Sequence, residues 1–406
     1  MTTSSNGRSR ANIVDPPNVW FDGFEKRQFT VNGVAACARI STNWSTNTDK
    51  PALVLLHGFP QTHAMWHRVA QALKSDYRLV LPDLRGYGDS SHAPGLPDHS
   101  NYSKRAMAQD VVGLLDQLHV DEFFLCGHDR GGRVAHRLAV DFPARVRRLC
   151  VLDIAPTLDM YTRTDMDFAR AYYHWFHLIQ PSPLPEQMIG GNVLNYLHAK
   201  LGGWGSGGTS FIEPEAMAAY ERSLNLAPEH AGDLMPAVHT ACEDYRASAG
   251  IDLVHDQESR DQGLKIQCDL LVLWGDRAVV HRMFKALELW QAQSAGLVSG
   301  HAFWHSGKLA GGHGGLFCNH GTNHLWQIYS RVAWRNTFCV RQFPAQSGQY
   351  GLFCADHAGG SGSWLVVRFD LEYHSGGHWQ YDRWCVSGGF AILVCTEKCN
   401  PRNRSG

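Results

Sequence analysis

Apolar runs alternate with helical patterns along the first 300 residues of the chain. Four runs are apolar over nearly their whole length, which is typical of parallel strands buried on both faces. Between them, apolar residues recur at the spacing of an amphipathic helix. This alternation predicts an α/β fold with a mostly parallel sheet. The predicted strands are Ala52–Leu56, Arg78–Asp83, Phe123–Cys126 and Val146–Asp153, after a strand pair within Gln28–Arg39, and the predicted helices are Met65–Leu73, Arg105–Leu118 and Val134–Val140.

The strand and helix rhythm stops after about residue 157 and resumes after about residue 252. The stretch between these points is helical in pattern and rich in aromatic residues, so we expect a cap inserted over the sheet. The rhythm resumes with a strand at Ile266–Trp274, a helix at His281–Gln293 and a last strand at Leu297–Phe303. The predicted organisation is therefore a disordered N-terminus (1–17), a first core segment (18–157), a helical cap (158–252), a second core segment (253–303) and an atypical tail (304–406).

Composition narrows the class of protein. With 406 residues, 44% of them hydrophobic, the chain can bury one large core and a cap. A formal net charge of −1 gives no general attraction to nucleic acid or to an anionic membrane surface. No window approaches the roughly 18 apolar residues of a membrane helix, and Met1–Arg10 lacks the apolar stretch of a secretory signal. We therefore expect a soluble, cytoplasmic protein.

The strongest candidate for chemistry is Gly127-x-Asp129-x-Gly131, between a predicted strand and a predicted helix. This is the context of a nucleophile elbow, with Asp in place of the usual Ser. A carboxylate can displace a leaving group from an alkyl carbon, and water must then hydrolyse the resulting ester. The backbone N–H groups of Phe59 and Arg130 are the expected oxyanion donors for that second step. The alternative reading is that Asp129 caps the helix that begins there.

Several stretches of the chain carry a more specific resemblance, and they span about Phe21 to His301. From this pattern the sequence resembles the fluoroacetate (haloacetate) dehalogenases of the α/β-hydrolase superfamily. Arg130 and Arg133 are one helical turn apart and can face one pocket, where guanidinium groups suit a substrate carboxylate. The alternative is a pair of surface arginines that bind acidic residues. The matching stretches are His57-Gly-Phe-Pro-Gln-Thr-His, Pro82-Asp-Leu-Arg-Gly-Tyr-Gly-Asp-Ser, Tyr102-Ser-Lys-Arg-Ala-Met-Ala-Gln-Asp, Gly127-His-Asp-Arg-Gly-Gly-Arg and Leu152-Asp-Ile-Ala-Pro-Thr-Leu-Asp-Met-Tyr.

The resemblance also implies roles for residues of the cap. It points to His174, Trp175 and Tyr245 as donors to the departing halide, with Trp204 as a further candidate for lining the pocket. Without the resemblance, each of these would be an ordinary core aromatic. The resemblance likewise implies Asp153 as the acid that orients the base. Asp276, next to the position that many enzymes of this fold use, is the alternative, and a turn role is the other reading of Asp153.

The base should be a histidine on the loop after the last strand, but the chain changes character near residue 303. The segment 303–406 is rich in Trp, Gly, His and Cys and poor in acids, and we hypothesise that a reading-frame change replaced the native end. His305 lies nearest the expected position. His301 has the right local sequence but is early, and His313 is late. The histidines and cysteines of this tail match no familiar zinc spacing, so no metal site is expected.

These observations predict a dehalogenase that converts haloacetate and water to glycolate and halide without a cofactor. Its expected partner is a small haloacid, with no nucleic acid and no membrane, and a homodimer is left open. An epoxide hydrolase shares the Asp nucleophile and is the enzymatic alternative, although it has no use for paired arginines. A protein of this fold that binds small carboxylates without turnover is the second alternative, because the base is in doubt.

Overall fold

The computed structural model describes residues 21–42, 44–46, 48–203, 208–230, 233–276, 278–303, 350–356 and 363–369, with the backbone alone for 301–303 and the last two segments. The predicted disordered segment 1–17 and most of the tail lie outside these residues. Within the described stretches of the chain, no helix is long and apolar enough to cross a membrane.

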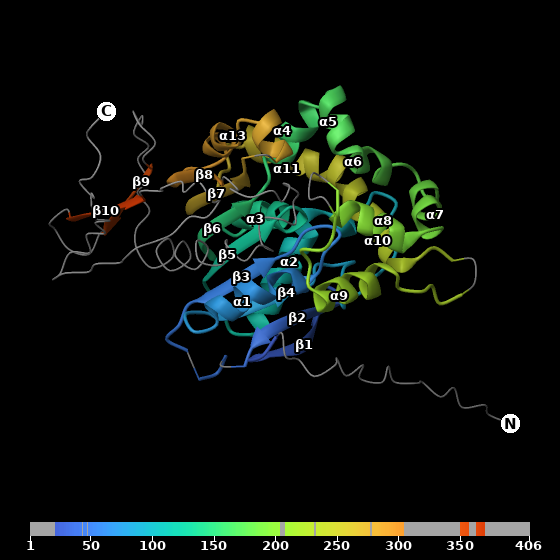
Figure 1. Ribbon diagram of the computed structural model, residues 1–406, viewed down its shortest axis with the longest axis horizontal. Helices are drawn as coiled ribbons and strands as arrows, with labels where there is room; N and C mark the ends of the chain where they lie inside the picture. The colour runs from blue at the N-terminus through green and yellow to red at the C-terminus, as the bar shows by residue number, and fades with distance from the viewer. Residues whose placement is uncertain are drawn as a thin grey trace, which may run out of the picture.

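An eight-stranded sheet forms the centre of the protein (Figure 1). Its strand order is β1-β2-β4-β3-β5-β6-β7-β8, and all neighbours from β4 to β8 are parallel. The predicted α/β architecture and the early strand pair are thereby confirmed. The strands are β1 (Phe24–Val31), β2 (Val34–Ser41), β3 (Ala52–Leu56), β4 (Arg78–Pro82), β5 (Phe123–His128), β6 (Val146–Leu152), β7 (Asp269–Gly275) and β8 (Val298–Phe303).

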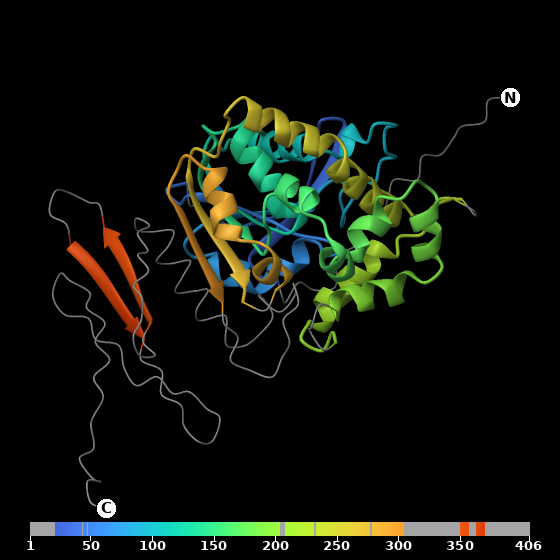
Figure 2. The ribbon, with the colours of Figure 1, turned by 90° about the horizontal axis from the view of Figure 1, so that it is seen from above.

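Helices cover the sheet between consecutive strands (Figure 2). The step from β3 to β4 runs opposite to the steps from β4 to β5 and from β5 to β6. Since such crossovers are right-handed, the first helix falls on one face of the sheet and the next two on the other. The helices are α1 (His67–Leu73), preceded by the 3₁₀ turn η1 (His63–Trp66), α2 (Lys104–Gln117), preceded by η2 (Ser100–Tyr102), and α3 (Arg130–Asp141).

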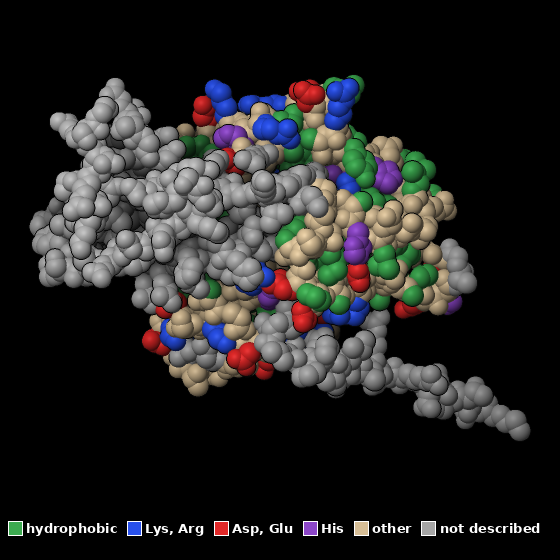
Figure 3. Space-filling model, viewed as in Figure 1, with side chains coloured by type: hydrophobic (Ala, Val, Ile, Leu, Met, Phe, Trp, Pro, Cys, Tyr) green, Lys and Arg blue, Asp and Glu red, His purple; other side chains and the backbone are tan. Residues whose placement is uncertain are grey.

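The segment between β6 and β7 is helical, as the aromatic pattern predicts. Helices α6 to α10 stand beside the sheet at the right of Figure 1, and α10 contacts α6, α7 and α9. A few apolar side chains of this block, including Tyr173, Leu184 and Met188, are exposed among polar ones (Figure 3). The helices are α4 (Thr157–Thr162), α5 (Met166–Ala171), α6 (Tyr173–Leu178), α7 (Leu184–Gly190), α8 (Val193–Leu201), α9 (Pro214–Leu224), α10 (Pro236–Ala249) and α11 (Ile251–Asp261).

One helix prediction is wrong. The expected continuous helix His281–Gln293 is divided into α12 (Val279–Met283) and α13 (Ala286–Ala292). Phe284 adopts an extended conformation between them and is buried edge-on against Phe168 of α5, with ring centroids 5.6 Å apart. Burial of the Phe284 ring therefore breaks a segment whose apolar spacing predicts one continuous helix. In the tail, β9 (Tyr350–Asp356) and β10 (Ser363–Phe369) form a separate antiparallel pair.

Candidate active site

The register of the sheet brings the predicted site residues to one edge. Gly127 of β5 pairs with Leu56 of β3 on one side and with Val151 of β6 on the other. The carboxyl ends of these three parallel strands are therefore level. The loops that leave them carry Phe59, Asp129 and Asp153. Ligands of open α/β sheets bind at this edge.

Asp129 occupies a strained turn between β5 and α3. Its φ is +46° and its ψ is −114°, a conformation that non-glycine residues seldom adopt. The glycines around it make the turn sterically feasible. A Cβ on Gly131 would collide with the backbone carbonyl of His57, and one on Gly58 would lie 2.7 Å from the Asp129 Cβ. Strain of this kind is typical of a functional site, whereas a simple helix cap does not require it.

The Asp129 carboxylate is partly exposed and points toward the loop after β3. The backbone N–H of Phe59 donates a hydrogen bond of 3.1 Å to Asp129 Oδ2. Phe59 is the predicted oxyanion donor on that loop. Its N–H is therefore already directed at the place where an ester of Asp129 would develop negative charge. As a helix N-cap, by contrast, Asp129 makes no side-chain hydrogen bond to α3.

The first arginine after Asp129 is held by an acid that the sequence analysis did not single out. Arg130 is fully buried, and its Nε and Nη2 donate to Asp244 Oδ2 and Oδ1 at 2.8 and 2.6 Å. Burial alone would lower the pKa of Arg130, but the Asp244 carboxylate raises it well above its usual range. Arg130 Nη1 is buried and has no hydrogen-bond acceptor among the described residues.

The second arginine has neutral neighbours. Arg133 is buried, and its guanidinium donates to Thr157 Oγ1 at 2.9 Å and to the Ala155 carbonyl at 3.3 Å. Its Nε has no acceptor in the described stretches of the chain, and no carboxylate there lies within 4.0 Å of it. Burial lowers the pKa of Arg133, and Asp129 opposes this effect. Both arginines are thus buried, which excludes the alternative of a surface pair.

Three aromatic residues from the helical segment complete the surroundings of these arginines. His174 and Trp175 belong to α6 and Tyr245 to α10, and all three are buried. The Tyr245 ring contacts His174 and Trp175, with centroids 5.8 and 6.4 Å apart, and covers the Arg130 guanidinium at 4.1 Å. The indole N–H of Trp175 and the hydroxyl of Tyr245 are buried without an acceptor among the described residues. Trp204 lies outside the described residues.

The structure describes the predicted acid at the site but does not place a predicted base there. Asp153 directly follows β6, is buried and has a φ of +54°, and its N–H donates to the Leu273 carbonyl at 2.7 Å. His301 lies inside β8, opposite Leu273, and so is not on the loop where a base is expected. His305 comes after the end of β8 and lies outside the described residues, as does His313. Neither His301 nor His305 is assigned as the base by the fold.

Two site residues escaped the sequence analysis although both adjoin residues that it named. Asp244 precedes Tyr245 in the sequence, and Tyr161 ends the stretch that begins at Leu152. Tyr161 is largely buried in contact with Trp175, at a centroid distance of 4.8 Å, and its hydroxyl has no acceptor among the described residues. The signal for Asp244 was an acid beside a predicted halide donor, but its pairing with Arg130 spans 114 positions of sequence.

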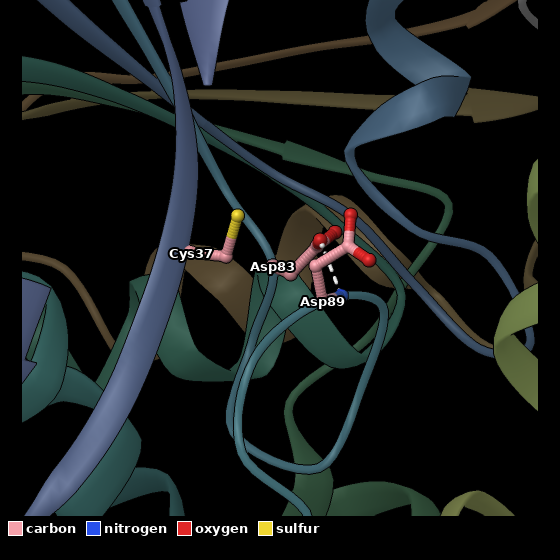
Figure 4. Close-up of side chains that lie close together, drawn as sticks. All are labelled: Cys37, Asp83 and Asp89. Atoms are coloured by element: carbon pink, nitrogen blue, oxygen red, sulfur yellow. Dashed lines mark hydrogen bonds between the residues drawn. The ribbon is translucent and has the colours of Figure 1, made fainter. Parts of the chain in front are cut away.

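A second group of polar side chains could be taken for a metal centre. Cys37, Asp83 and Asp89 lie close together at the amino-terminal half of the sheet (Figure 4). Asp83 already accepts hydrogen bonds from His63 and from the backbone N–H of Asp89, and Asp89 pairs with Lys26 at 2.9 Å. Burial and the two acids raise the pKa of the Cys37 thiol far above its usual range. Both carboxylates of this group are therefore already engaged by donors of the protein.

Comparisons with known proteins identify the family of this chain. Residues 51–197 match the family model of the alpha/beta hydrolase fold. Fluoroacetate dehalogenase from a Burkholderia species is 41% identical over 288 residues, which cover 70% of this chain and 90% of the relative. The chain belongs to the haloacetate dehalogenase family of the α/β-hydrolase superfamily.

Other relatives of this dehalogenase-family chain either match a smaller part of it or have a less specific description. A solved structure presented as an α/β hydrolase from Nostoc sp. PCC 7120 has 42% sequence identity and a TM-score of 0.67, covering 76% of this chain and 98% of its own. Epoxide hydrolase 2 from Siraitia grosvenorii is 42% identical over 105 residues, 26% of this chain and 32% of the relative. The fold and these relatives establish a hydrolase, and its substrate is a separate question.

Proposed function

We propose that this hydrolase converts a haloacetate, such as fluoroacetate or chloroacetate, and water to glycolate and halide. The observation that supports the proposal is a set of buried donors near the partly exposed Asp129 that have no acceptor in the part of the chain that the structure describes. Two are guanidinium atoms, which suit an anionic carboxylate, and two are neutral donors of the kind that a halide binds. These donors are Arg130 Nη1, Arg133 Nε, Trp175 Nε1 and Tyr245 OH.

The reaction begins with attack by the Asp129 carboxylate on the carbon that carries the halogen. A C–O bond forms, the carbon–halogen bond breaks, and the halide leaves with the bonding electron pair. The N–H and O–H groups of Trp175 and Tyr245 stabilise this charge in a dry pocket, and His174 stacks on Phe59 beside them. The arginines hold the substrate carboxylate, which reduces its repulsion from the nucleophile.

Hydrolysis of the aspartyl ester completes the cycle. Water adds to the ester carbonyl, a base accepts its proton, and collapse of the intermediate releases glycolate and restores Asp129. The Phe59 N–H, already 3.1 Å from Asp129 Oδ2, would stabilise the oxyanion. The candidate base is His305, which follows the last strand, because His301 lies inside β8, and Asp153 is the acid proposed to orient it. No metal or cofactor takes part in this reaction scheme.

Fluoride release from fluoroacetate tests the proposal. Free fluoride is counted against enzyme in a rapid time course, with chloroacetate as a second substrate and an Asp129→Asn variant as control. Sustained release that Asp129→Asn abolishes would support the full cycle. A burst of at most one fluoride per protein would mean that Asp129 is alkylated but lacks a base. Folded protein that releases no halide from either substrate would refute the proposal.

Epoxide hydrolysis is the second candidate, because two tyrosines near Arg130 and Arg133 have hydroxyls without acceptors among the described residues. Tyr161 and Tyr245 offer the pair of donors that an epoxide oxygen would need. The two buried guanidinium groups weigh against this function, since a neutral epoxide has no anionic group for them to bind. Diol formation from styrene oxide, with no fluoride from fluoroacetate, would favour the epoxide.

A further inference from the structure

A buried ionic cluster joins the sheet domain to the helical segment directly behind the nucleophile. Asp244 of α10 accepts hydrogen bonds from Arg130 of α3, Lys104 of α2 and the hydroxyl of Tyr87, the last at 2.6 Å. Asp252 of α11 accepts the backbone N–H of Lys104 at 2.8 Å. All five residues are buried. Asp244 of α10 therefore ties α2, α3 and the loop after β4 to one carboxylate.

The contacts of Asp244 fix both the position and the plane of the Arg130 guanidinium. Its two carboxylate oxygens bind Nε and Nη2, and its backbone carbonyl also accepts from Nη2 at 2.8 Å. Burial alone would raise the pKa of Asp244, but Arg130 and Lys104 hold it far below its usual range. Asp244 is therefore ionised at neutral pH. A planar fork held at two nitrogens leaves one donor edge, and that edge carries Nη1.

The next residue of α10 encloses the same guanidinium from above. The ring of Tyr245 lies 4.1 Å from Arg130 Cζ, and its hydroxyl is the proposed halide donor. One turn of α10 thus carries both the anchor of Arg130 and a donor for the leaving group. Stability alone does not explain this arrangement, because a buried ion pair often contributes no more than well-packed apolar residues would.

We propose that Asp244 is a positioning residue that holds Arg130 so that Nη1 is the one guanidinium nitrogen left to bind the substrate carboxylate. Asp244 also compensates the charge of Arg130, whereas Arg133 has neutral acceptors. Arg133 therefore supplies the positive charge that attracts the substrate, and Arg130 supplies an oriented hydrogen bond. This inference rests on the proposed function in assigning a carboxylate to the two arginines.

The neighbouring residue on α10 provides a matched control. Glu243 is also a buried carboxylate and also pairs with an arginine, Arg246, at 2.7 Å. The hydrogen bonds of Arg246 go to Glu243, to Glu186 and to the Gln180 carbonyl, away from Asp129 and its arginines. Asp244→Asn and Glu243→Gln therefore remove the same charge from the same helix, but Asp244→Asn alone releases the Arg130 fork.

Binding of glycolate to the full chain tests the inference separately from turnover. The dissociation constant is measured by ligand-observed NMR titration for the wild type and both variants, with circular dichroism as the check on folding. We expect Asp244→Asn to weaken binding on the order of tenfold or more, and Glu243→Gln to change it by less than about twofold. Equal affinity of wild type and Asp244→Asn, or no glycolate binding by the wild type, would overturn the inference. Absence of fluoride release would count against the proposed reaction instead.

Two further variants guard against a simple folding defect. Asp244→Glu keeps the buried negative charge but displaces it by one methylene, so it should fold and still weaken glycolate binding severalfold. An Asp244→Glu protein with wild-type affinity would contradict the inference. In an Arg130→Met background, Asp244→Asn should add no further loss of affinity, because the fork that it positions is absent. Additive losses would mean that Asp244 acts through some other contact.

Discussion

Replacing Tyr245 by phenylalanine removes one hydroxyl and retains the ring. The ring is fully buried and meets Phe59 edge-on at 5.4 Å, His174 at 5.8 Å and the Arg130 guanidinium at 4.1 Å. The hydroxyl has no hydrogen-bond acceptor among the described residues. The substitution therefore leaves the packing intact and removes a buried polar group that no described residue satisfies.

Stability and activity should respond to this change in opposite directions. A buried hydroxyl without an acceptor costs about 1–3 kcal/mol, so Tyr245→Phe should be as stable as the wild type or more stable by up to about 1 kcal/mol. Loss of one aligned donor to a developing negative charge in a dry site costs about 10²–10³-fold in rate. Because Trp175 is also a proposed donor to the halide, we expect a loss of about 10²-fold in kcat for fluoroacetate.

Two measurements decide the outcome. Urea unfolding followed by circular dichroism gives the free energy of unfolding, and a fluoride electrode gives kcat with fluoroacetate. Tyr245→Phe that is less stable by more than about 1 kcal/mol would show that the hydroxyl binds another group of the protein. Fluoride release at the wild-type rate would show that Tyr245 does not stabilise the leaving halide. Either result would refute the reasoning.

Three other substitutions test separate features of the site and its surroundings. Gly131→Ala should prevent the elbow from forming, because its Cβ would collide with the His57 carbonyl. Soluble yield and circular dichroism measure this, and a variant that folds like the wild type would contradict the prediction. Arg133→Met should raise KM for fluoroacetate about 100-fold. It should leave the melting temperature unchanged or higher, because Arg133 is a buried cation with neutral acceptors. An unaltered KM would exclude Arg133 from carboxylate binding. Burial, with a smaller contribution from Asp252, raises the pKa of Asp256 to about 6, so the folded state binds a proton more tightly than the unfolded chain. Protonated Asp256 therefore adds at most about 3 kcal/mol to the free energy of unfolding, an effect that is full below about pH 4 and lost as the pH rises through about 6. In urea unfolding, the difference in stability between wild type and Asp256→Asn should change over this pH range. A constant difference would contradict the raised pKa.

Local pattern was sufficient for most of the sheet. Strand β3 was predicted to the residue, because an apolar run buried on both faces differs sharply from its polar flanks. The elbow at Asp129 could also be predicted, because its glycines, strand and helix are adjacent in sequence. The helix His281–Gln293 was not, because Phe284 follows helical spacing and its partner Phe168 is more than a hundred positions earlier.

By itself, the sequence indicated an aspartate on a strand-to-helix turn and two arginines one helical turn apart, and only its resemblance to a family pointed to aromatic donors in the intervening segment. The resemblance to the dehalogenase family then suggested a role for each of these residues. Tertiary structure decided how the two arginines differ, because the acid that binds Arg130 comes from α10, 114 positions away, while Arg133 meets neutral groups. The physical reason is that charge compensation and burial depend on which elements pack together, and no local pattern of residues records that contact.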